Sequence, residues 1–377
     1  MAGQILKTNF SLDDKYTLFE GRVILSGIQA LVRLLLDQHR ADIIKGINTG
    51  TLVSGYRGSP VGTLDINLVK NKKILDEHNV KFIPGVNEDL GATLIYGSQM
   101  AGMVSNVKYD GVLGMWYGKA PGVDRSGDIF RHANFLGVGK NGGVLAVAGD
   151  DPSCKSSTLP SQSEPALFDA MMPIFYPGNV QEILDLGRYA YEMSRYSGLW
   201  SGFKIVTDIA DGFGSAFVDP QRVNITIPDF TYNGQPWKHT QNAKLVGHHS
   251  LPTEKEIHLG RITAAKHFLA SNPINKITVQ GDQDKFGIIT AGKTYYDVIE
   301  AFESLGWTTE YLNKVGIRIL KLGATFPVDS QIIDKFSKGL DDIFVIEEKR
   351  SFIEMLVKEE LYNSPTKPTI VGKYDED

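Results

Sequence analysis

NEDLGATLIYGSQMAG, residues 87–102, is the stretch that decides the fold. Its spacing predicts a helix over residues 87–104, because one helical face collects Leu90, Leu94, Gly97, Met100 and Ala101. Asn87 is a suitable N-cap for that helix. The segment before it, Val80–Val86, is apolar and strand-like. A strand that leads into a helix is the unit from which parallel α/β sheets are built.

The same alternation continues on both sides of this stretch. Further strands are predicted at Thr51–Ser54, Tyr109–Tyr117, Gly143–Ala148 and Phe203–Ile209. Further helices are predicted at Ile24–His39, Leu64–Leu75 and Val180–Ser197. The strands are apolar without alternation, which is typical of a parallel sheet covered on both faces. We therefore expect one α/β domain over residues 1–217.

A different composition follows. Residues 218–255 are polar, contain four prolines and show little helical periodicity, which predicts a linker or crossover segment. The α/β alternation then resumes over residues 256–377, which predicts a smaller second domain. Its expected strands are Lys276–Gln280, Phe286–Ala291, Gly316–Leu322 and Asp342–Glu347, and its expected helices are His258–Ser271, Thr294–Leu305, Val328–Ser337 and Ser351–Tyr362. The polar tail, Ser364–Asp377, is predicted to have no element of its own.

The composition narrows the classes of function. The 377 residues are 42% hydrophobic and carry a net charge of −5, without a basic stripe, so we expect no nucleic-acid partner. The apolar runs are far shorter than the roughly 20 residues of a membrane span, so we expect a cytoplasmic protein. Cys154 is the only cysteine, which excludes an internal disulfide and an iron–sulfur cluster held by this chain alone. Neither His/Cys clusters nor a metal-ligand motif occur, so no metal site is predicted.

Glycine-rich segments follow several predicted strands and are expected to converge at the carboxyl edge of the sheet, where ligands bind in open α/β folds. These segments are Gly55–Thr63, Gly118–Asp128 and Gly149–Glu164. They offer cationic and hydroxyl donors, which are Arg57, Ser59, Lys119, Arg125, Ser156 and Ser157. Such donors suit a small anionic substrate such as a carboxylate.

Four motifs resemble one enzyme family. Residues 87–102 resemble the thiamine-diphosphate glutamate helix of 2-oxoacid:ferredoxin oxidoreductases. SGYRGSP, residues 54–60, resembles the G-Y-P-G-T-P substrate loop of that family, and DDPSCKSS, residues 150–157, resembles the D-D-P…S-S stretch of indolepyruvate ferredoxin oxidoreductases. GIITAG at 287–292 and VIEE at 345–348 resemble the transketolase C-terminal domain. The resemblance implies a pyrimidine-type thiamine-diphosphate-binding domain followed by a transketolase C-terminal-like domain.

The resemblance also implies roles for individual residues. In this family a glutamate shares a proton with the cofactor's aminopyrimidine ring, and Glu88 is the candidate catalytic residue. Glu88, Gly91 and Tyr56 are expected to contact the cofactor. The expected substrate contacts are Ser59, Arg57, Arg125 and Lys119. Arg57 stands where the family has a proline, which puts the choice of substrate in doubt.

The implied reaction is oxidative decarboxylation of a 2-oxoacid, an aryl pyruvate such as indolepyruvate, with coenzyme A and ferredoxin as partners. The sequence lacks the G-D-G…N motif that holds Mg²⁺ and the diphosphate, and it lacks ferredoxin-like cysteine motifs. We therefore expect a fragment or subunit of a homo- or hetero-oligomer. A pyrophosphate-binding domain or subunit would hold the Mg²⁺, and the iron–sulfur clusters would lie elsewhere.

Several plainer interpretations stay open. Glu88 can serve only to stabilise the first turn of its helix. The chain can be a non-catalytic assembly module of a thiamine enzyme, or the β half of a 2-oxoacid dehydrogenase, although the D-D-P…S-S loop argues against the latter. The pairs Asp150-Asp151 and Ser156-Ser157 are interpreted first as turn residues.

Overall fold

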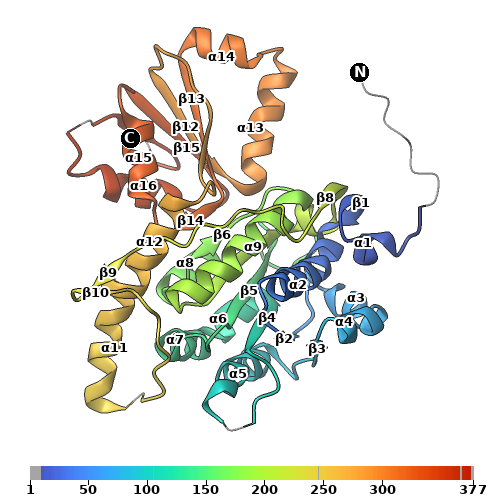
Figure 1. Cartoon of the computed structure of the whole chain (residues 1–377). Coiled ribbons are helices and arrows are strands. Elements are labelled where there is room, and N and C mark those ends of the chain that lie inside the picture. The colour runs from blue at the N-terminus through green and yellow to red at the C-terminus, as the bar shows by residue number, and fades with distance from the viewer. Residues whose placement is uncertain (1–9, 105, 245, 366, 375–377) are drawn as a thin grey trace.

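The computed structural model describes residues 10–104, 106–244, 246–365 and 367–374. Figure 1 shows two α/β units, a larger lower one coloured blue to green and a smaller upper one coloured orange to red. Helices at the left of the view connect them. The predicted α/β fold class with largely parallel sheets is confirmed.

A seven-stranded sheet forms the centre of the first unit, with the order β14-β6-β7-β5-β4-β2-β3. All neighbouring pairs are parallel except β14 and β6. Its strands are β2 (Thr49–Gly55), β3 (Val80–Phe82), β4 (Gly111–Lys119), β5 (Gly143–Asp150), β6 (Ile174–Phe175), β7 (Ser201–Val206) and β14 (Ala324–Phe326). Gly55 pairs with Tyr117, and Tyr117 pairs with Val147, so these carboxyl ends meet at one edge.

Two long helices, α2 (Gly27–Ile44) and α9 (Val180–Ser197), pack against each other and against the sheet. A second group, α5 (Glu88–Gln99), α6 (Ala120–Arg125) and α7 (Gly127–Leu136), packs together beside β2 and β4. Shorter helices complete the unit: α1 (Asp14–Thr17), α3 (Leu64–Lys70), α4 (Lys72–Glu77), α8 (Glu164–Asp169) and α10 (Thr207–Asp211). The segment 118–128, predicted as a loop, is therefore mostly helical. Pro121 in the first turn of α6 is compatible with a helix there.

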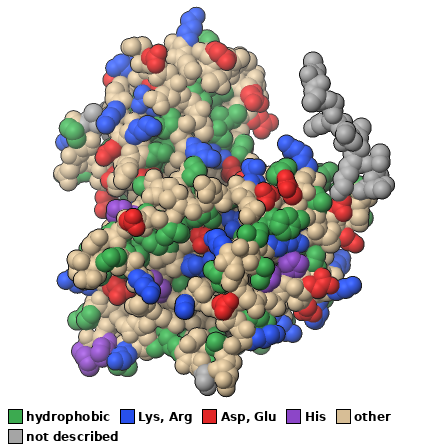
Figure 2. Space-filling view, viewed as in Figure 1, with side chains coloured by type: hydrophobic (Ala, Val, Ile, Leu, Met, Phe, Trp, Pro, Cys, Tyr) green, Lys and Arg blue, Asp and Glu red, His purple; other side chains and the backbone are tan. Residues whose placement is uncertain are grey.

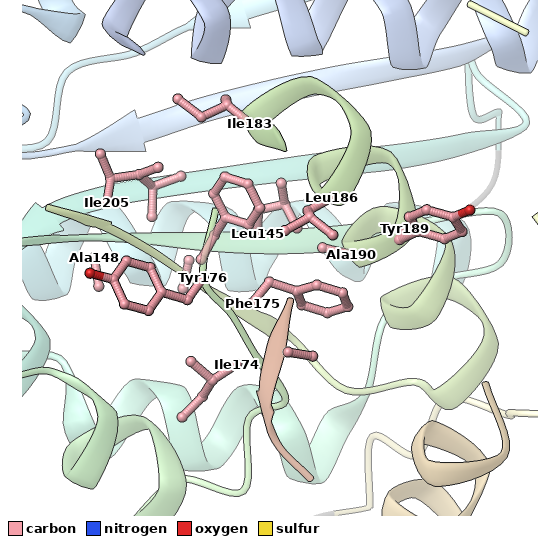
Figure 3. Close-up of a cluster of buried hydrophobic side chains, with 14 of the residues drawn as sticks. Leu145, Ala148, Ile174, Phe175, Tyr176, Ile183, Leu186, Tyr189, Ala190 and Ile205 are labelled. Atoms are coloured by element: carbon pink, nitrogen blue, oxygen red, sulfur yellow. The ribbon is translucent and has the colours of Figure 1, made fainter. Parts of the chain in front are cut away.

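The core of the first unit lies between α9 and the strands β5, β6 and β7. Figure 3 shows Ile183, Leu186 and Ala190 of α9 in one cluster with Leu145 of β5 and Ile205 of β7. All five side chains are buried. The strand residue Phe175 and its neighbour Tyr176 extend in opposite directions in Figure 3, and Tyr176 continues toward the second unit.

The start of the first unit differs from the prediction. Gly21–Ser26 forms strand β1, which pairs antiparallel with β8 (Phe213–Val218). The helix predicted from Ile24 begins instead at Gly27, where Ser26 and Gln29 form a reciprocal capping box. The end of the strand predicted at Phe203–Ile209 is likewise helical, as α10.

The segment predicted as a linker wraps along the first unit. It contains the hairpin β9 (Thr231–Tyr232) and β10 (Gln235–Pro236), a 3₁₀ turn (Gly247–His249) and the start of α11 (Ser250–Glu256). A π turn (Ile257–Arg261) joins α11 to α12 (Ile262–Ser271). Trp237 Nε1 donates to the Tyr196 carbonyl over 2.9 Å, and Gln241 Nε2 donates to the Gln99 carbonyl over 2.8 Å. The segment predicted as a linker is thus fixed to the first unit.

A five-stranded sheet, in the order β11-β13-β12-β15-β16, forms the second unit. Its strands are β11 (Lys276–Val279), β12 (Phe286–Ala291), β13 (Ile317–Leu322), β15 (Asp342–Ile346) and β16 (Thr369–Val371), and its helices are α13 (Gly292–Ser304), α14 (Thr309–Val315), α15 (Ser330–Ser337) and α16 (Ile353–Leu361). Only the edge strand β11 runs antiparallel to its neighbour in this sheet. The tail prediction is wrong, because β16 lies within it.

The surface carries both signs of charge. Figure 2 shows Lys and Arg side chains interspersed with Asp and Glu over the face in view. No helix in the described ranges has the length and apolar character needed to cross a membrane. The same part of the chain holds no group of three or more His, Cys, Asp and Glu side chains placed to bind a metal ion.

Candidate functional site

The predicted glycine-rich segments meet at the carboxyl edge of the first sheet. The Tyr56 backbone N–H donates to the Tyr117 carbonyl over 3.0 Å, and a Cβ added at Gly58 would lie 2.9 Å from Lys119 Cδ. Ser59 Oγ is hydrogen-bonded to Ser156 Oγ. The predicted convergence of the three glycine-rich segments is thus confirmed.

Glu88 is the first residue of α5, at this edge. The Asn87 side chain accepts from the Leu90 backbone N–H over 2.9 Å, so Asn87 caps α5 as predicted. Trp116 Nε1 donates to the Glu88 carbonyl over 2.9 Å, and the Trp116 side chain is fully buried. Glu88 itself is 9% exposed. The backbone of Glu88 is therefore held from both the helix and β4.

Gly122 makes room for the Glu88 side chain. A Cβ added at Gly122 would lie 2.5 Å from Glu88 Cγ and 3.2 Å from Glu88 Oε1. A Cβ added at Gly118 would lie 2.7 Å from the Trp116 ring and 3.6 Å from Glu88 Cγ, so Gly118 makes room for Trp116 and only borders the Glu88 side chain. Among the residues that the structure describes, none donates a hydrogen bond to the Glu88 carboxylate. The carboxylate is a nearly buried acceptor without an internal donor, which fits the ring N–H of an aminopyrimidine.

Helix α5 approaches β2 closely through glycines. A Cβ added at Gly91 would lie 3.0 Å from Gly55 Cα, 3.1 Å from Gly55 N and 3.4 Å from Ser54 Oγ. Ser54 Oγ is buried and has no hydrogen-bond partner in the described part of the chain. Gly91 therefore has the close-packing role that lets α5 lie on the end of β2. The predicted helix over 87–104 is shorter, because α5 ends at Gln99 and a 3₁₀ turn (Ala101–Met103) follows.

The predicted substrate residues surround this edge. Arg125 Nε lies 3.3 Å from Asp89 Oδ1 in a pair of exposed side chains. Arg57 is exposed, Tyr56 is 39% exposed, and the stem of Lys119 packs beside Gly58. The structure thus brings the candidates together around the ends of β2 and β4.

Asp151 organises the third loop. Its carboxylate accepts backbone N–H groups from Lys155, Ser156 and Ser157, each over 2.8 Å. Burial works to raise the pKa of Asp151, but these N–H donors outweigh it and lower the pKa to about 2. The Asp150 carboxylate accepts from Ser163 N over 2.8 Å and from Ser163 Oγ over 2.5 Å. Asp150 is the last residue of β5, so the turn prediction is wrong for it, whereas Asp151 and Ser156-Ser157 lie in the loop that follows.

A buried ionic cluster that the sequence did not predict lies behind this loop. Lys204 of β7 is 1% exposed, and its Nζ donates to Glu164 Oε1 over 2.6 Å and to Glu348 Oε2 over 3.1 Å. Tyr176 Oη donates to Glu348 Oε2 over 2.6 Å. Burial raises the pKa of the adjacent Asp150 to about 6. The cluster joins the two units, because Glu348 follows β15 of the second sheet.

Comparisons with known proteins agree with this architecture. Residues 275–377 match the family described as the indolepyruvate ferredoxin oxidoreductase middle domain. Two relatives, named indolepyruvate oxidoreductase subunit IorA, come from Pyrococcus horikoshii and Pyrococcus abyssi. Each is 27% identical to this chain. The match to the P. horikoshii relative covers 71% of this chain and 40% of the relative, and the match to the P. abyssi relative covers 93% of this chain and 49% of the relative. The chain spans about half the length of the curated relatives it matches.

Two solved structures share the fold. A 2-oxoglutarate:ferredoxin oxidoreductase from Magnetococcus marinus aligns with a TM-score of 0.66 and 14% identity, over 93% of this chain and 62% of that one. A split-gene transketolase aligns with a TM-score of 0.51 and 12% identity, over 93% and 90%. The predicted fold class and the resemblance to the indolepyruvate ferredoxin oxidoreductase family are confirmed. The relatives are oxidoreductase subunits.

Two features of the site escaped the sequence analysis. The first is Gly122, whose lack of a side chain leaves space for Glu88. The glycine that ends GKAPG, residues 118–122, was the available signal. The second is the ionic cluster around Lys204, whose members are far apart in the sequence and carry no motif.

Proposed function

We propose that this chain supplies the aminopyrimidine-binding half of a thiamine-diphosphate-dependent 2-oxoacid:ferredoxin oxidoreductase that acts on an aryl pyruvate such as indolepyruvate. One observation carries the proposal: the Glu88 carboxylate lies nearly buried in a glycine-lined space, without a donor from the described chain, at the edge where ligands bind in this fold. The names of the relatives support the substrate class.

Glu88 holds a proton at one atom of the cofactor. Its carboxylate would accept the N–H of the aminopyrimidine ring, and this contact would favour the imino tautomer, whose exocyclic nitrogen can act as a base. When bound, thiamine diphosphate supplies the nucleophilic carbon and the electron sink for decarboxylation.

The substrate is bound on the solvent side of Glu88. Arg57, Arg125 and Lys119 supply positive charge for the oxoacid carboxylate, and Ser59 supplies a hydroxyl donor. An arginine suits this task because its planar guanidinium can bind a carboxylate through two hydrogen bonds. The exposed pair between Arg125 and Asp89 costs little to break, which leaves Arg125 free to turn to the substrate.

The diphosphate and Mg²⁺ require a second polypeptide unit. An apolar strip on the outer side of α5 and the preceding segment suits its docking: Ile83, Val86, Leu90 and Leu94 are 39%, 79%, 47% and 40% exposed. The same unit would close the solvent side of the Glu88 space. The iron–sulfur centres that would accept electrons on the way to ferredoxin would be held outside this chain, and coenzyme A is the proposed acyl acceptor.

Glu88→Gln in the assembled oxidoreductase tests the proposal. The amide cannot share a proton as the carboxylate does, so we expect turnover of the 2-oxoacid, followed by reduction of a viologen dye, to fall by about 10²–10⁴-fold. Glu310→Gln is the matched control, because Glu310 is also a first-turn carboxylate but lies on α14 of the second unit. Loss of helix stabilisation alone would lower the melting temperature of both variants and leave turnover intact. Unchanged turnover of Glu88→Gln would favour the non-catalytic assembly module.

A further inference from the structure

A turn of the second unit, residues 347–350, holds both ends of the loop that carries Ser156. Lys349 Nζ donates to the Pro152 carbonyl over 2.8 Å, at the start of the loop. At its end, the Arg350 backbone N–H donates to Gln162 Oε1 over 3.2 Å, and Gln162 Nε2 donates to the Arg350 carbonyl over 3.4 Å. These partners lie 197 and 188 residues apart in the chain. The loop is thus clamped by a segment of the other unit.

The turn is itself firmly held. The Glu347 carboxylate accepts the backbone N–H groups of Phe352, Ile353 and Glu354 at 2.8–3.1 Å, which satisfies the start of α16. The Glu348 carboxylate binds Lys204 and Tyr176 in the buried cluster. Lys349 has a φ of +58°, a left-handed conformation. Neighbouring side chains therefore have different partners: the partly buried Glu348 bonds to the ionic cluster, and Lys349 bonds to the loop.

The loop contacts the predicted substrate segment on its other side. Ser156 Oγ is hydrogen-bonded to Ser59 Oγ. A Cβ added at Gly149 would lie 3.0 Å from Pro60 Cδ and 3.2 Å from the Val61 methyl groups, so the two segments are in close contact at their bases as well. A displacement of the loop would therefore change the position of Ser59.

We infer that residues 347–350 position the Pro152–Gln162 loop, and through it Ser59, for binding of the oxoacid carboxylate. Lys349 is then a positioning residue, because it acts through the Pro152 carbonyl and not on the substrate. The inference rests on the proposed function for the identity of the ligand. The clamping of the loop rests on the contacts alone.

Lys349→Met tests the inference, because methionine keeps the apolar stem and removes the donor. In the assembled oxidoreductase we expect KM for the 2-oxoacid to rise roughly 3- to 10-fold, with kcat changed less than about twofold, as for the loss of one hydrogen bond from a charged donor. In the 377-residue chain we expect faster amide exchange of the peptide 152–162 and unchanged exchange of β4 and β5. Lys349→Arg, which keeps a donor, should restore both values. Lys285→Met is the matched control, since Lys285 pairs with Asp341 at the surface.

The outcomes separate this inference from the proposed function. Unchanged exchange of the loop in Lys349→Met would overturn the clamp. Faster exchange with unchanged KM would overturn the link to the substrate, even if Glu88→Gln abolishes turnover. Unchanged turnover of Glu88→Gln would overturn the proposed function, and faster loop exchange in Lys349→Met would still support the clamp.

Discussion

At the scale of one residue, the position of Glu88 depends on Gly122, because this glycine has no side chain. Gly122 lies inside the helix α6, where glycine is less favourable than alanine by about 1 kcal/mol. Its φ is not left-handed, so the backbone does not require glycine. The Glu88 side chain does require it, because a Cβ would lie 2.5 Å from Glu88 Cγ. Gly122 therefore belongs to the site and not to the turn chemistry of the chain.

Gly122→Ala should separate activity from stability. The new methyl group gains helix propensity, and the atom that it meets belongs to a side chain that can rotate away. We expect the free energy of unfolding to change by less than about 1 kcal/mol, while turnover of the assembled enzyme falls at least about 10-fold because the carboxylate moves. Gly102→Ala, where a Cβ meets nothing within 4 Å, is the control and should leave turnover unchanged. Full activity of Gly122→Ala would show that the Glu88 position is not critical.

At the scale of elements, local signals found the strand–helix units and missed the non-local pairings. The stretch 87–102 predicted α5 and its Asn87 cap, because capping and periodicity are properties of neighbouring residues. Strand β1 was missed because Val23, Ile24 and Leu25 are all apolar, although Ile24 is 61% exposed in the structure. Strand β16 was missed because it lies in the polar tail of the chain, where residues 369–371 form a strand only by pairing with β15.

The outer face of α5 shows the same limit. Leu90, Leu94 and Gly97 share a face, as predicted, but that face is exposed. The buried residues of α5 are Glu88, Gly91, Ala92, Ile95 and Gln99. Periodicity identifies a helix without saying which neighbour covers each side. The site was predictable as far as Glu88 and the converging loops, because motifs mark them. The contacts that the second unit makes near this site could not be predicted, because the local sequence carries no signal for them.

The Asp151 loop should respond to pH with a definite sign. The folded pKa of Asp151, about 2, lies below its ordinary value of 3.8, so its contribution to loop order is present above about pH 4 and is lost as the pH falls through about 2. Asp151→Asn should expose the amides of residues 155–157 even at pH 7, because a neutral amide oxygen is the weaker acceptor. Amide exchange read by mass spectrometry checks this. Equal protection in Asp151→Asn at neutral pH would contradict the role of the carboxylate.

At the scale of the whole molecule, the two units are connected both by strand pairing and by an ion pair. Strand β14, from residues 324–326, pairs with β6 of the first sheet. Lys204 of the first sheet bonds to Glu348 of the second unit, and its Nζ lies 4.3 Å from the centre of the Tyr176 ring. Burial alone would lower the pKa of Lys204, but the neighbouring acidic groups, led by Glu164, raise it above its ordinary value. The ammonium is therefore charged and compensates the largely shielded carboxylates of Glu164 and Glu348.

Lys204→Met should loosen this junction. Removal of one partner of a buried ion pair leaves Glu164 and Glu348 uncompensated, at a cost of about 3–5 kcal/mol. We expect that loss in the free energy of unfolding, measured with denaturant on the 377-residue chain. Lys285→Met removes a surface pair and should cost less than about 1 kcal/mol. Similar small losses for both variants would show that the cluster does not join the units.

The central claim, that Glu88 shares a proton with the aminopyrimidine ring of thiamine diphosphate, is tested most directly by hydrogen–deuterium exchange at the reactive thiazolium carbon. The exchange is measured in the assembled enzyme without substrate, so substrate binding and electron transfer do not affect it. We predict that Glu88→Gln slows it by about 10²–10⁴-fold relative to the unmodified enzyme, with cofactor bound in both. Equal exchange rates in the two enzymes would contradict the claim.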